Sequence, residues 1–321
     1  MRIPGLKTAR KTVLWMKNKI IPGALVLGYH RIAEAENDSF YNCTSPLHFD
    51  QQMQVLHKHA NPINLDALIA YLNNGEPPPK TVCVTIDDGY ADALYNAKPI
   101  LEKYEIPATV FVTTGNLGGE FWWDELERYI LQAPDNAGLL RLRKDKLNFE
   151  WDFNHQDPAK RASQIISIAD FLRPLDETIR QQILSKIKKW SSNSKGELPP
   201  TRSMTPTELV SLMEGTLLQI GSHTVTHPML SKLSEQERWY EINQSKQDLE
   251  EILSKPVLGL SYPNGCFEKG DPELVLKSGY RYACVSKNGM VRSNSDRFQL
   301  PRFWIRDIDG ETFYRWLKEW V

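Results

Sequence analysis

Residues 82–89 read VCVTIDDG, an apolar run that ends abruptly in two adjacent carboxylates, Asp87 and Asp88, and a glycine. An apolar run of this length, bounded by a turn signal, is typical of a strand buried on both faces of a parallel sheet. Two carboxylates side by side repel each other and resist desolvation, and a divalent cation would offset that cost. The alternative is a loop in which an aspartate caps the next helix.

The composition narrows the class of protein. The chain has 321 residues, 41% hydrophobic and 25% charged, which is enough for one large domain or two smaller ones. A formal net charge of −1 favours neither nucleic acid nor acidic substrates as partners. The four cysteines lie far apart with no Cys-x-x-Cys pair, which suits a reducing compartment and excludes a zinc ribbon. No apolar run approaches the roughly 18 residues that span a bilayer.

Residues 1–23 form a basic N-terminal arm, in which the first 22 residues hold Lys and Arg but no acid. We predict no signal peptide, because Pro22 and Gly23 interrupt the apolar stretch and residues 24–29 make a better core strand. The predicted location is therefore the cytoplasm. The arm is expected to be a helix packed on the domain, with peripheral contact to the inner surface of an anionic membrane as the alternative.

From residue 24 onwards, short apolar runs alternate with helical patterns. Capping boxes that begin at Thr205 and Ser234 predict the starts of two of the helices. Residues 121–204 break the alternation with helical patterns and no convincing strand, and we interpret them as a helical insertion. Strands are predicted at residues 24–29, 82–87, 108–114, 217–222, 257–262, 282–286 and 298–305. Over residues 24–321 this order predicts a parallel α/β barrel or a doubly wound sheet.

A second informative stretch, residues 221–228, reads GSHTVTHP and places His223 and His227 four residues apart. Two such imidazoles can share a metal ion with a carboxylate, a donor set that suits Zn²⁺ and related ions. Unrelated surface histidines are the alternative. Both histidines and Asp87 follow predicted strands, and the carboxyl ends of all strands in a parallel barrel meet on one face.

Three motifs together resemble those of a known family. TIDDG at residues 85–89, SHTVTHP at 222–228 and SYPNG at 261–265 are similar, in order and spacing, to the motif series of the polysaccharide deacetylases. This is the NodB-homology fold, carbohydrate esterase family four. The resemblance covers residues 24–302 apart from the insertion. It implies a deformed (β/α) TIM-like barrel and a metal-dependent hydrolase that removes acetyl groups from N-acetylated sugars of a polysaccharide or glycan precursor.

The resemblance also implies roles for individual residues. Asp88, His223 and His227 match the metal ligands, and Asp87 matches the catalytic base that deprotonates a metal-activated water. The implied cofactor is a divalent metal, with Zn²⁺ expected and Co²⁺, Mn²⁺ or Ni²⁺ as alternatives. The third motif implies a substrate and oxyanion contact at Tyr262, Pro263 and Asn264, with the backbone N–H of Asn264 as the donor.

This sequence departs from the family pattern in two places. The arginine that usually begins the third motif is replaced by Ser261, and we predict that Arg302, in the last strand, supplies the guanidinium instead. A structural arginine is the alternative. The late histidine of the family is absent, and we predict that His30, after the first strand, is a proton donor or lines the site. A hydrogen-bonded core or loop histidine is the alternative.

Two other functions stay open. The same metal site could hydrolyse a non-sugar amide, because a barrel does not choose its substrate. The chain could also be a degenerate carbohydrate-binding protein, which Ser261 and the missing late histidine favour. The intact Asp87, Asp88, His223 and His227 favour an enzyme, because a binding protein has no need of a base beside a metal. The predicted partner is a carbohydrate, and no nucleic acid is expected.

Overall fold

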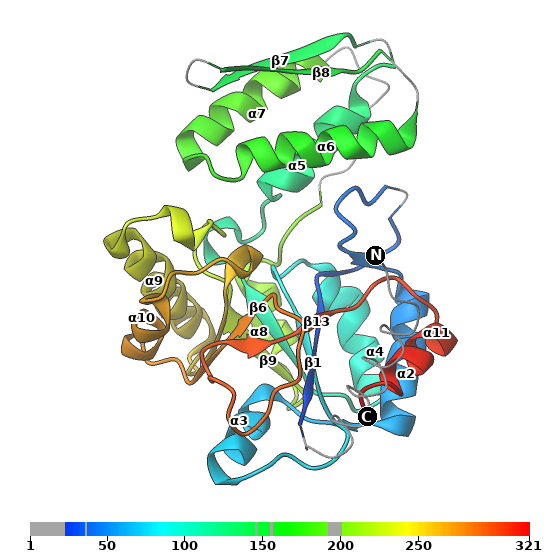
Figure 1. The fold of residues 1–321 in the computed structure, drawn as a ribbon, viewed down its shortest axis with the longest axis vertical. Coiled ribbons are helices and arrows are strands. Elements are labelled where there is room, and N and C mark those ends of the chain that lie inside the picture. The colour runs from blue at the N-terminus through cyan, green and yellow to red at the C-terminus, as the bar shows by residue number, and fades with distance from the viewer. Residues whose placement is uncertain (1–22, 36, 136, 145–146, 155–156, 192–200) are drawn as a thin grey trace, which may run out of the picture. The chain divides into compact units, whose positions relative to one another are not determined.

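The computed structural model describes residues 23–191 and 201–321, apart from positions 36, 136, 145–146 and 155–156 (Figure 1). All but the last residue of the predicted basic arm lies outside this part of the chain. Two compact units emerge from the contacts. The barrel unit comprises the described residues of Met1–Ala35, Asn42–Gly115 and Met204–Val321, and the inserted unit comprises those of Glu36–Tyr41 and Asn116–Ser203.

The barrel unit is built on one sheet of nine strands, in which every pairing is parallel. Eight of these strands follow the path β12-β11-β10-β9-β6-β5-β1-β13, and β4 pairs with β5 beside it. The strands are β1 (Leu25–Tyr29), β4 (Asn61–Pro62), β5 (Thr81–Ile86), β6 (Ala108–Val112), β9 (Leu218–Ser222), β10 (Gly259–Ser261), β11 (Tyr282–Val285), β12 (Leu300–Pro301) and β13 (Phe303–Trp304). A separate parallel pair joins β2 (Arg31–Ile32) to β3 (Cys43–Thr44).

The two ends of this path are neighbours in the chain, with only Arg302 between β12 and β13. Leu300 pairs with Cys284 of β11, and Phe303 pairs with Leu27 of β1. One short stretch therefore bridges the two edges of the sheet, which forms a nearly closed barrel. The prediction of a parallel barrel is confirmed, and the doubly wound sheet is excluded. The strand predicted at residues 298–305 is interrupted where it changes partner.

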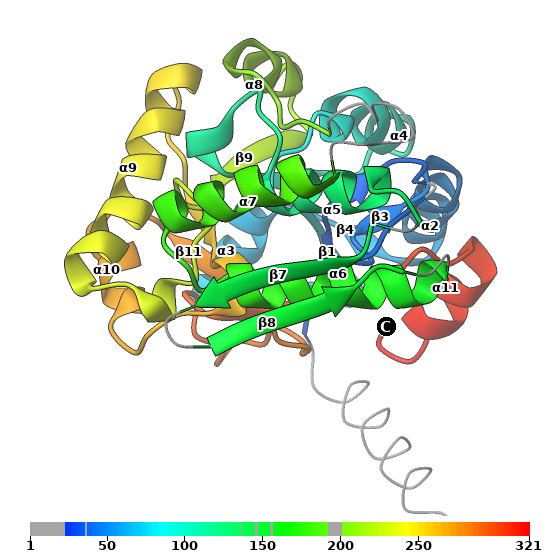
Figure 2. The same cartoon turned by 90° about the horizontal axis from the view of Figure 1, so that it is seen from above.

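Helices surround this sheet, as Figure 2 shows in the view from above. They are α2 (Pro46–His59), α3 (Leu65–Asn74), α4 (Lys98–Lys103), α8 (Pro206–Leu212), α9 (Glu235–Leu253), α10 (Asp271–Lys277) and α11 (Gly310–Leu317). Short helical turns are η1 (Ala93–Ala97), η2 (Thr114–Asn116), η3 (Leu230–Lys232) and η4 (Pro263–Gly265). Both predicted capping boxes are present, at Thr205 before α8 and at Ser234 before α9. Within the described part of the chain, every helix is too short or too polar to cross a bilayer.

The barrel interior is filled by side chains from alternate positions of the strands. Its apolar part includes Ala24, Val26, Cys83, Phe111, Tyr282, Cys284 and Leu300. Two glycines make room for the rings: a Cβ atom on Gly221 would lie 2.4 Å from Cδ1 of Phe111, and one on Gly259 would lie 2.2 Å from Cε2 of Tyr282. At the carboxyl ends of the strands the buried side chains become polar, and this change places the candidate site.

The described residues of the inserted unit form three helices and a β-hairpin (Figure 1). The helices are α5 (Trp122–Gln132), α6 (Pro158–Leu172) and α7 (Glu177–Ser191), and the hairpin joins β7 (Leu139–Lys144) to β8 (Leu147–Asp152). The prediction that residues 121–204 hold no strand is therefore wrong. Leu140 and Leu142 are buried on either side of exposed Arg141, and this alternation was a readable strand signal.

Candidate metal and catalytic site

The strand ends of the barrel bring the predicted site residues to one face. Asp87 and Asp88 follow β5, and His223 follows β9. His30 follows β1, which pairs with β5 in a register that sets Tyr29 opposite Ile86. Arg302 lies between β12 and β13. Strand order and register thus bring together residues that are far apart in the sequence.

Asp88, His223 and His227 form a compact group of potential metal ligands. One ligand atom from each lies within 4.8 Å of the others. The Oδ1 atom of Asp88 is 3.5 Å from the Nε2 atoms of both histidines. Asp88 and His223 are buried, and His227 is partly exposed. One carboxylate and two imidazoles fit a divalent ion such as zinc, and three protein ligands leave a coordination position open.

His223 is held in the form that a metal requires. Its Nδ1 atom lies 2.7 Å from the backbone oxygen of Ser261. Because a carbonyl oxygen can only accept, a neutral imidazole must carry its proton on Nδ1, which leaves the Nε2 lone pair facing Asp88. Burial lowers the pKa of His223, helped by the charge of Arg302, although Asp87 and the Ser261 hydrogen bond oppose this. The ring is therefore neutral at neutral pH.

The backbone at two of these ligands is strained. Asp88 has φ 73° and His227 has φ 56°, in the left-handed region that residues with a Cβ atom avoid. Such conformations cost of order 1–3 kcal/mol each and persist where surrounding structure imposes them. After Asp88 the chain continues through Gly89, whose Cβ would lie 3.1 Å from the methyl groups of Val112. The tight passage beside β6 and a backbone φ of 77° both favour a glycine at position 89.

Asp87 sits in a buried hydrogen-bond network that engages both oxygens of its carboxylate. Arg302 donates from Nη1 to Oδ1 of Asp87 at 2.7 Å and from Nη2 to Oδ2 at 2.8 Å, a bidentate pair. The Ser261 hydroxyl donates to Oδ2 at 2.9 Å and accepts from Nη2 of Arg302 at 2.8 Å. Thr85 accepts a further hydrogen bond from Nη1 at 3.1 Å. The predicted partnership of Arg302 with Asp87 is present in the structure.

The electrostatics of this network favour an ionised base. Burial alone raises the pKa of Asp87, but the charges of Arg302 and His223 and the Arg302 hydrogen bonds outweigh it. The net effect holds the pKa of Asp87 well below its ordinary value. Oδ2 of Asp87 is also 3.6 Å from Nε2 of His223. Asp87 therefore lies beside the ligand group as a carboxylate that can accept a proton.

His30 lies at the same face and is partly exposed. Its ring stacks on Trp304 with centroids 4.3 Å apart and planes within 15°. The Arg302 guanidinium packs over the same indole, 4.6 Å from its centroid. Burial, with smaller contributions from Arg302 and His223, lowers the pKa of His30 to about 4, against the opposing effect of Asp87. At neutral pH the free protein therefore holds His30 as a neutral imidazole.

The third motif presents only one of its three predicted residues to solvent. Tyr262 is completely buried, its ring stacks on Phe267, and its N–H donates to the carbonyl of Cys284 at 3.1 Å. Pro263 is buried too. The motif folds into the turn η4, which buries Tyr262 and Pro263. The structure therefore gives these two side chains no exposed surface for the predicted substrate contact. Asn264 is exposed, with φ 55°.

Two residues of this region escaped the sequence analysis. Thr85 supports Arg302 and also donates to the carbonyl of Leu27 at 2.8 Å. Its position two residues before Asp87 on a strand puts both side chains on one face, which was a usable signal. Glu241 of α9 accepts hydrogen bonds from the loop between His223 and His227. Nothing in its local pattern distinguished it from a solvated helix residue.

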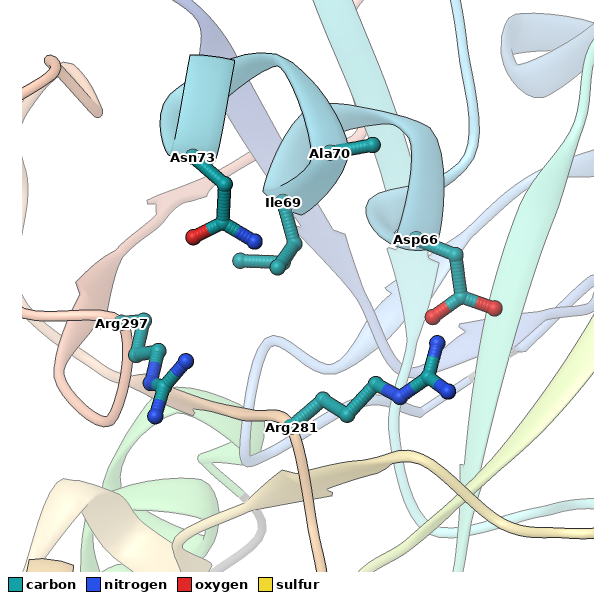
Figure 3. A pocket seen from close by; sticks show the side chains of 6 residues that line it. All are labelled: Asp66, Ile69, Ala70, Asn73, Arg281 and Arg297. Carbon is teal, nitrogen blue, oxygen red and sulfur yellow. The ribbon is translucent and has the colours of Figure 1, made fainter.

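A different polar group lies at the opposite, amino ends of the strands. Asp66 and Asn73 of α3, with Arg281 before β11 and Arg297 before β12, line a cavity of about 270 Å³ (Figure 3). Oδ2 of Asp66 accepts a hydrogen bond from Nε2 of Gln219 at 2.9 Å. In barrels of this kind the amino end contributes to stability and the carboxyl end to chemistry. We therefore assign this group to stability.

Similarity to known proteins agrees with the geometry. The sequence model of the polysaccharide deacetylase family matches residues 74–134 and 185–283. A poly-beta-1,6-N-acetyl-D-glucosamine N-deacetylase of Staphylococcus epidermidis is 34% identical over 314 residues, covering 92% of this chain and 83% of that protein. Its namesake in Staphylococcus aureus strain MRSA252 is 23% identical over 312 residues, covering 92% and 82%.

Solved structures share the fold. The Streptococcus pyogenes deacetylase PplD, in complex with acetate, has a TM-score of 0.60 at 19% identity and covers 92% of this chain and 98% of its own. IcaB from Ammonifex degensii has a TM-score of 0.59 at 17% identity, covering 92% and 97%. The family model, the relative at 34% identity and the shared barrel lead to one conclusion. The chain belongs to the polysaccharide deacetylase family and is a hydrolase of that family.

Proposed function

We propose that this enzyme removes acetyl groups from N-acetylglucosamine units of a polysaccharide or its precursor, with a divalent metal held by Asp88, His223 and His227. The observation that carries the proposal is the buried bidentate pair of Asp87 and Arg302 beside that ligand group. The names of the staphylococcal relatives suggest a β-1,6-linked polymer as the substrate. Zn²⁺ is the ion that the donor set favours.

Each residue of the site has a separate proposed role in the reaction. A divalent metal at this site supplies a Lewis acid that activates water and polarises the acetyl carbonyl. Asp87 accepts the proton of the attacking water, and Arg302 with Ser261 keeps its carboxylate ionised and aligned. The N–H of Asn264 is the proposed oxyanion donor, which acts where negative charge develops. His30 is the proposed proton donor to the leaving amine, and because it starts neutral, the proton that it passes on is the one that Asp87 takes from the water.

The Arg302 network weakens the case for a degenerate binding protein. Ser261 removes the arginine usual in the third motif, yet a guanidinium reaches Asp87 from another strand and Ser261 itself joins the network. Burying a charged pair is costly, and a protein that only binds sugar gains nothing from it. A non-sugar amide as the substrate, the cytoplasmic location and a membrane contact through residues 1–23 stay predictions.

The test is acetate release from N-acetylated oligosaccharides, lipid-linked sugars and simple amides, before and after chelation and again with Zn²⁺ restored. We expect release from the sugars, loss on chelation and recovery with Zn²⁺. Asp87→Asn should lower kcat by about 10²–10⁴-fold while it retains Zn²⁺, because the base is lost and the ligands stay. His223→Ala should lose Zn²⁺ binding, and His30→Ala should lower kcat with Zn²⁺ bound.

Each alternative predicts a different result. Release only from the simple amides would establish the non-sugar hydrolase. No release from any substrate, by protein that holds one metal ion per chain, would favour the degenerate binding protein. Wild-type turnover by Asp87→Asn would show that Asp87 is not the base.

A further inference from the structure

One buried carboxylate ties the loop between His223 and His227 to helix α9. Oε2 of Glu241 accepts the N–H of Val225 at 2.8 Å and the N–H of Thr226 at 2.9 Å. Its other oxygen, Oε1, accepts the hydroxyl of Thr226 at 2.7 Å. Glu241 is only 6% exposed. A carboxylate this buried needs donors in place of water, and the loop supplies three of them.

The loop that Glu241 holds is a strained one. Thr224 has φ 66° and His227 has φ 56°, so the two residues that flank Val225 and Thr226 both lie in the left-handed region. A chain with side chains at these positions relaxes elsewhere unless other contacts favour the strained turn. The two amides between them are the ones that Glu241 binds. Its carboxylate therefore stabilises the turn that places Nε2 of His227 at 3.5 Å from Oδ1 of Asp88.

Other contacts hold this loop through different atoms from those that Glu241 binds. The N–H of His223 donates to the carbonyl of Val112 at 2.8 Å, and the N–H of Gly115 donates to the carbonyl of Val225 at 2.7 Å. These bonds hold the loop against the segment after β6. The N–H groups of Val225 and Thr226 point the other way, to α9. The N–H of His227 donates to Oγ1 of Thr224 at 3.2 Å, so Glu241 holds the two amides between the histidines while Thr224 holds that of His227.

We propose that Glu241 is a positioning residue of the metal site, acting through the loop between His223 and His227. It touches neither substrate nor the reacting atoms. The inference rests on the proposed function, because it requires that Asp88, His223 and His227 bind an ion. Residues that orient metal ligands typically change metal affinity by about 10–100-fold when they are removed.

The experiment compares Zn²⁺ dissociation constants, measured against a chromophoric chelator, and the visible spectra of the Co²⁺-loaded proteins. Glu241→Met keeps side-chain length but removes the acceptors, and Glu241→Gln restores an oxygen that can accept both amides. The matched control is Glu250→Ala, on the same helix, because Glu250 also accepts a backbone N–H, from Val257 at 2.9 Å, but serves a different loop. Unfolding of each metal-free protein is measured in parallel.

We expect Glu241→Met to raise the Zn²⁺ dissociation constant by about 10–100-fold and to change the Co²⁺ spectrum. Glu241→Gln should recover most of the affinity. Glu250→Ala should reduce stability without changing either metal readout, since a merely structural contact on α9 does not orient a ligand.

Two results would overturn the inference while leaving the proposed function intact: wild-type affinity in Glu241→Met, or an equal loss in Glu250→Ala. If Glu241→Met fails to fold, Thr226→Val decides, because it removes one donor to Glu241 from the loop side. A dissociation constant for Thr226→Val within error of wild type would then reject the inference, and a rise of a few fold would support it. A wild-type protein that binds no Zn²⁺ would instead overturn the metal site itself.

Discussion

Arg302 and Asp87 form a bidentate pair inside the barrel, and both side chains are almost wholly excluded from solvent. Desolvating two charges costs several kcal/mol for each, so such a pair is weak as a source of stability. The pair instead gives Asp87 a fixed orientation and an ionised state beside the ligand group. Removal of one partner is then far more damaging than the net stabilisation of the pair suggests, because the other charge stays buried.

We expect Arg302→Ala to lower the free energy of unfolding by about 3–5 kcal/mol, because Asp87 is left buried and uncompensated. It should also lower kcat by about 100-fold, since the base loses its alignment. Urea unfolding and acetate release measure the two effects. Arg315→Ala is the matched control, as Arg315 lies exposed on α11 and should leave both unchanged.

A double substitution separates charge from volume at this pair. Combining Arg302→Met with Asp87→Asn removes both charges, so the loss of stability should be clearly smaller than the sum of the two single losses. If the losses of unfolding free energy simply add, the two side chains do not interact. Arg302 would then have a structural role only.

Strands β9 and β10 each contain a glycine whose missing side chain leaves room for a ring from a neighbouring strand. Gly221 and Gly259 leave space that the rings of Phe111 and Tyr282 occupy from neighbouring strands. Protein interiors are packed tightly enough that one added methyl group forces the surroundings to move. These two elements therefore tolerate no side chain at those positions, although glycine normally weakens a strand.

We expect Gly259→Ala to destabilise the protein by about 1–3 kcal/mol, because its Cβ would lie 2.2 Å from the Tyr282 ring. Gly270→Ala is the matched control. Nothing lies within 4 Å of a Cβ at Gly270, so the change should stay within about 0.5 kcal/mol. Chemical denaturation compares them, and equal effects would show that the ring of Tyr282 does not limit the site.

Across the whole barrel unit, the two ends of the strands serve different purposes. The carboxyl ends carry the Asp87 network and the ligand group, while the amino ends carry Asp66, Gln219 and the arginines of the cavity in Figure 3. Substitutions at the carboxyl ends should therefore change catalysis, and substitutions at the amino ends should change only stability. This separation is a property of the closed parallel sheet, because only there do all strand ends of one kind meet.

We expect Asp66→Ala to lower stability by about 0.5–1.5 kcal/mol, through loss of the Gln219 hydrogen bond, with kcat unchanged. Burial raises the pKa of Asp66, against the effects of Gln219 and Arg281. The folded state therefore binds the proton more tightly than the unfolded chain, so the contribution of Asp66 is greatest at acidic pH and falls as pH rises through the raised pKa.

The loss of stability in Asp66→Ala, compared with wild type at the same pH, should thus be larger at about pH 4 than at about pH 7. Unfolding curves at both pH values check the sign. A fall in kcat as large as that of Arg302→Ala would contradict the division between the two ends.

Much of the fold was readable locally. The apolar run before Asp87, the two capping boxes and the alternation of strands with helices depend on neighbouring residues, so local patterns predicted most strands and a parallel barrel or doubly wound sheet. The choice of the barrel and of Asp88, His223 and His227 as a group came from the resemblance of the three motifs to the polysaccharide deacetylases. The hairpin β7–β8 carried a strand signal too, which the helical patterns around it obscured.

Only the tertiary structure decided which groups complete the site. Arg302 and Asp87 are 215 residues apart, and they meet because the stretch between β12 and β13 bridges the two edges of the sheet. The burial of Tyr262 and the contact of Glu241 with the histidine loop likewise follow from how η4 and α9 pack. Sequence periodicity sets which face a side chain takes within its own element. Closure of the barrel and packing between elements set which side chain it meets. No local pattern encodes a contact between residues so far apart in the sequence.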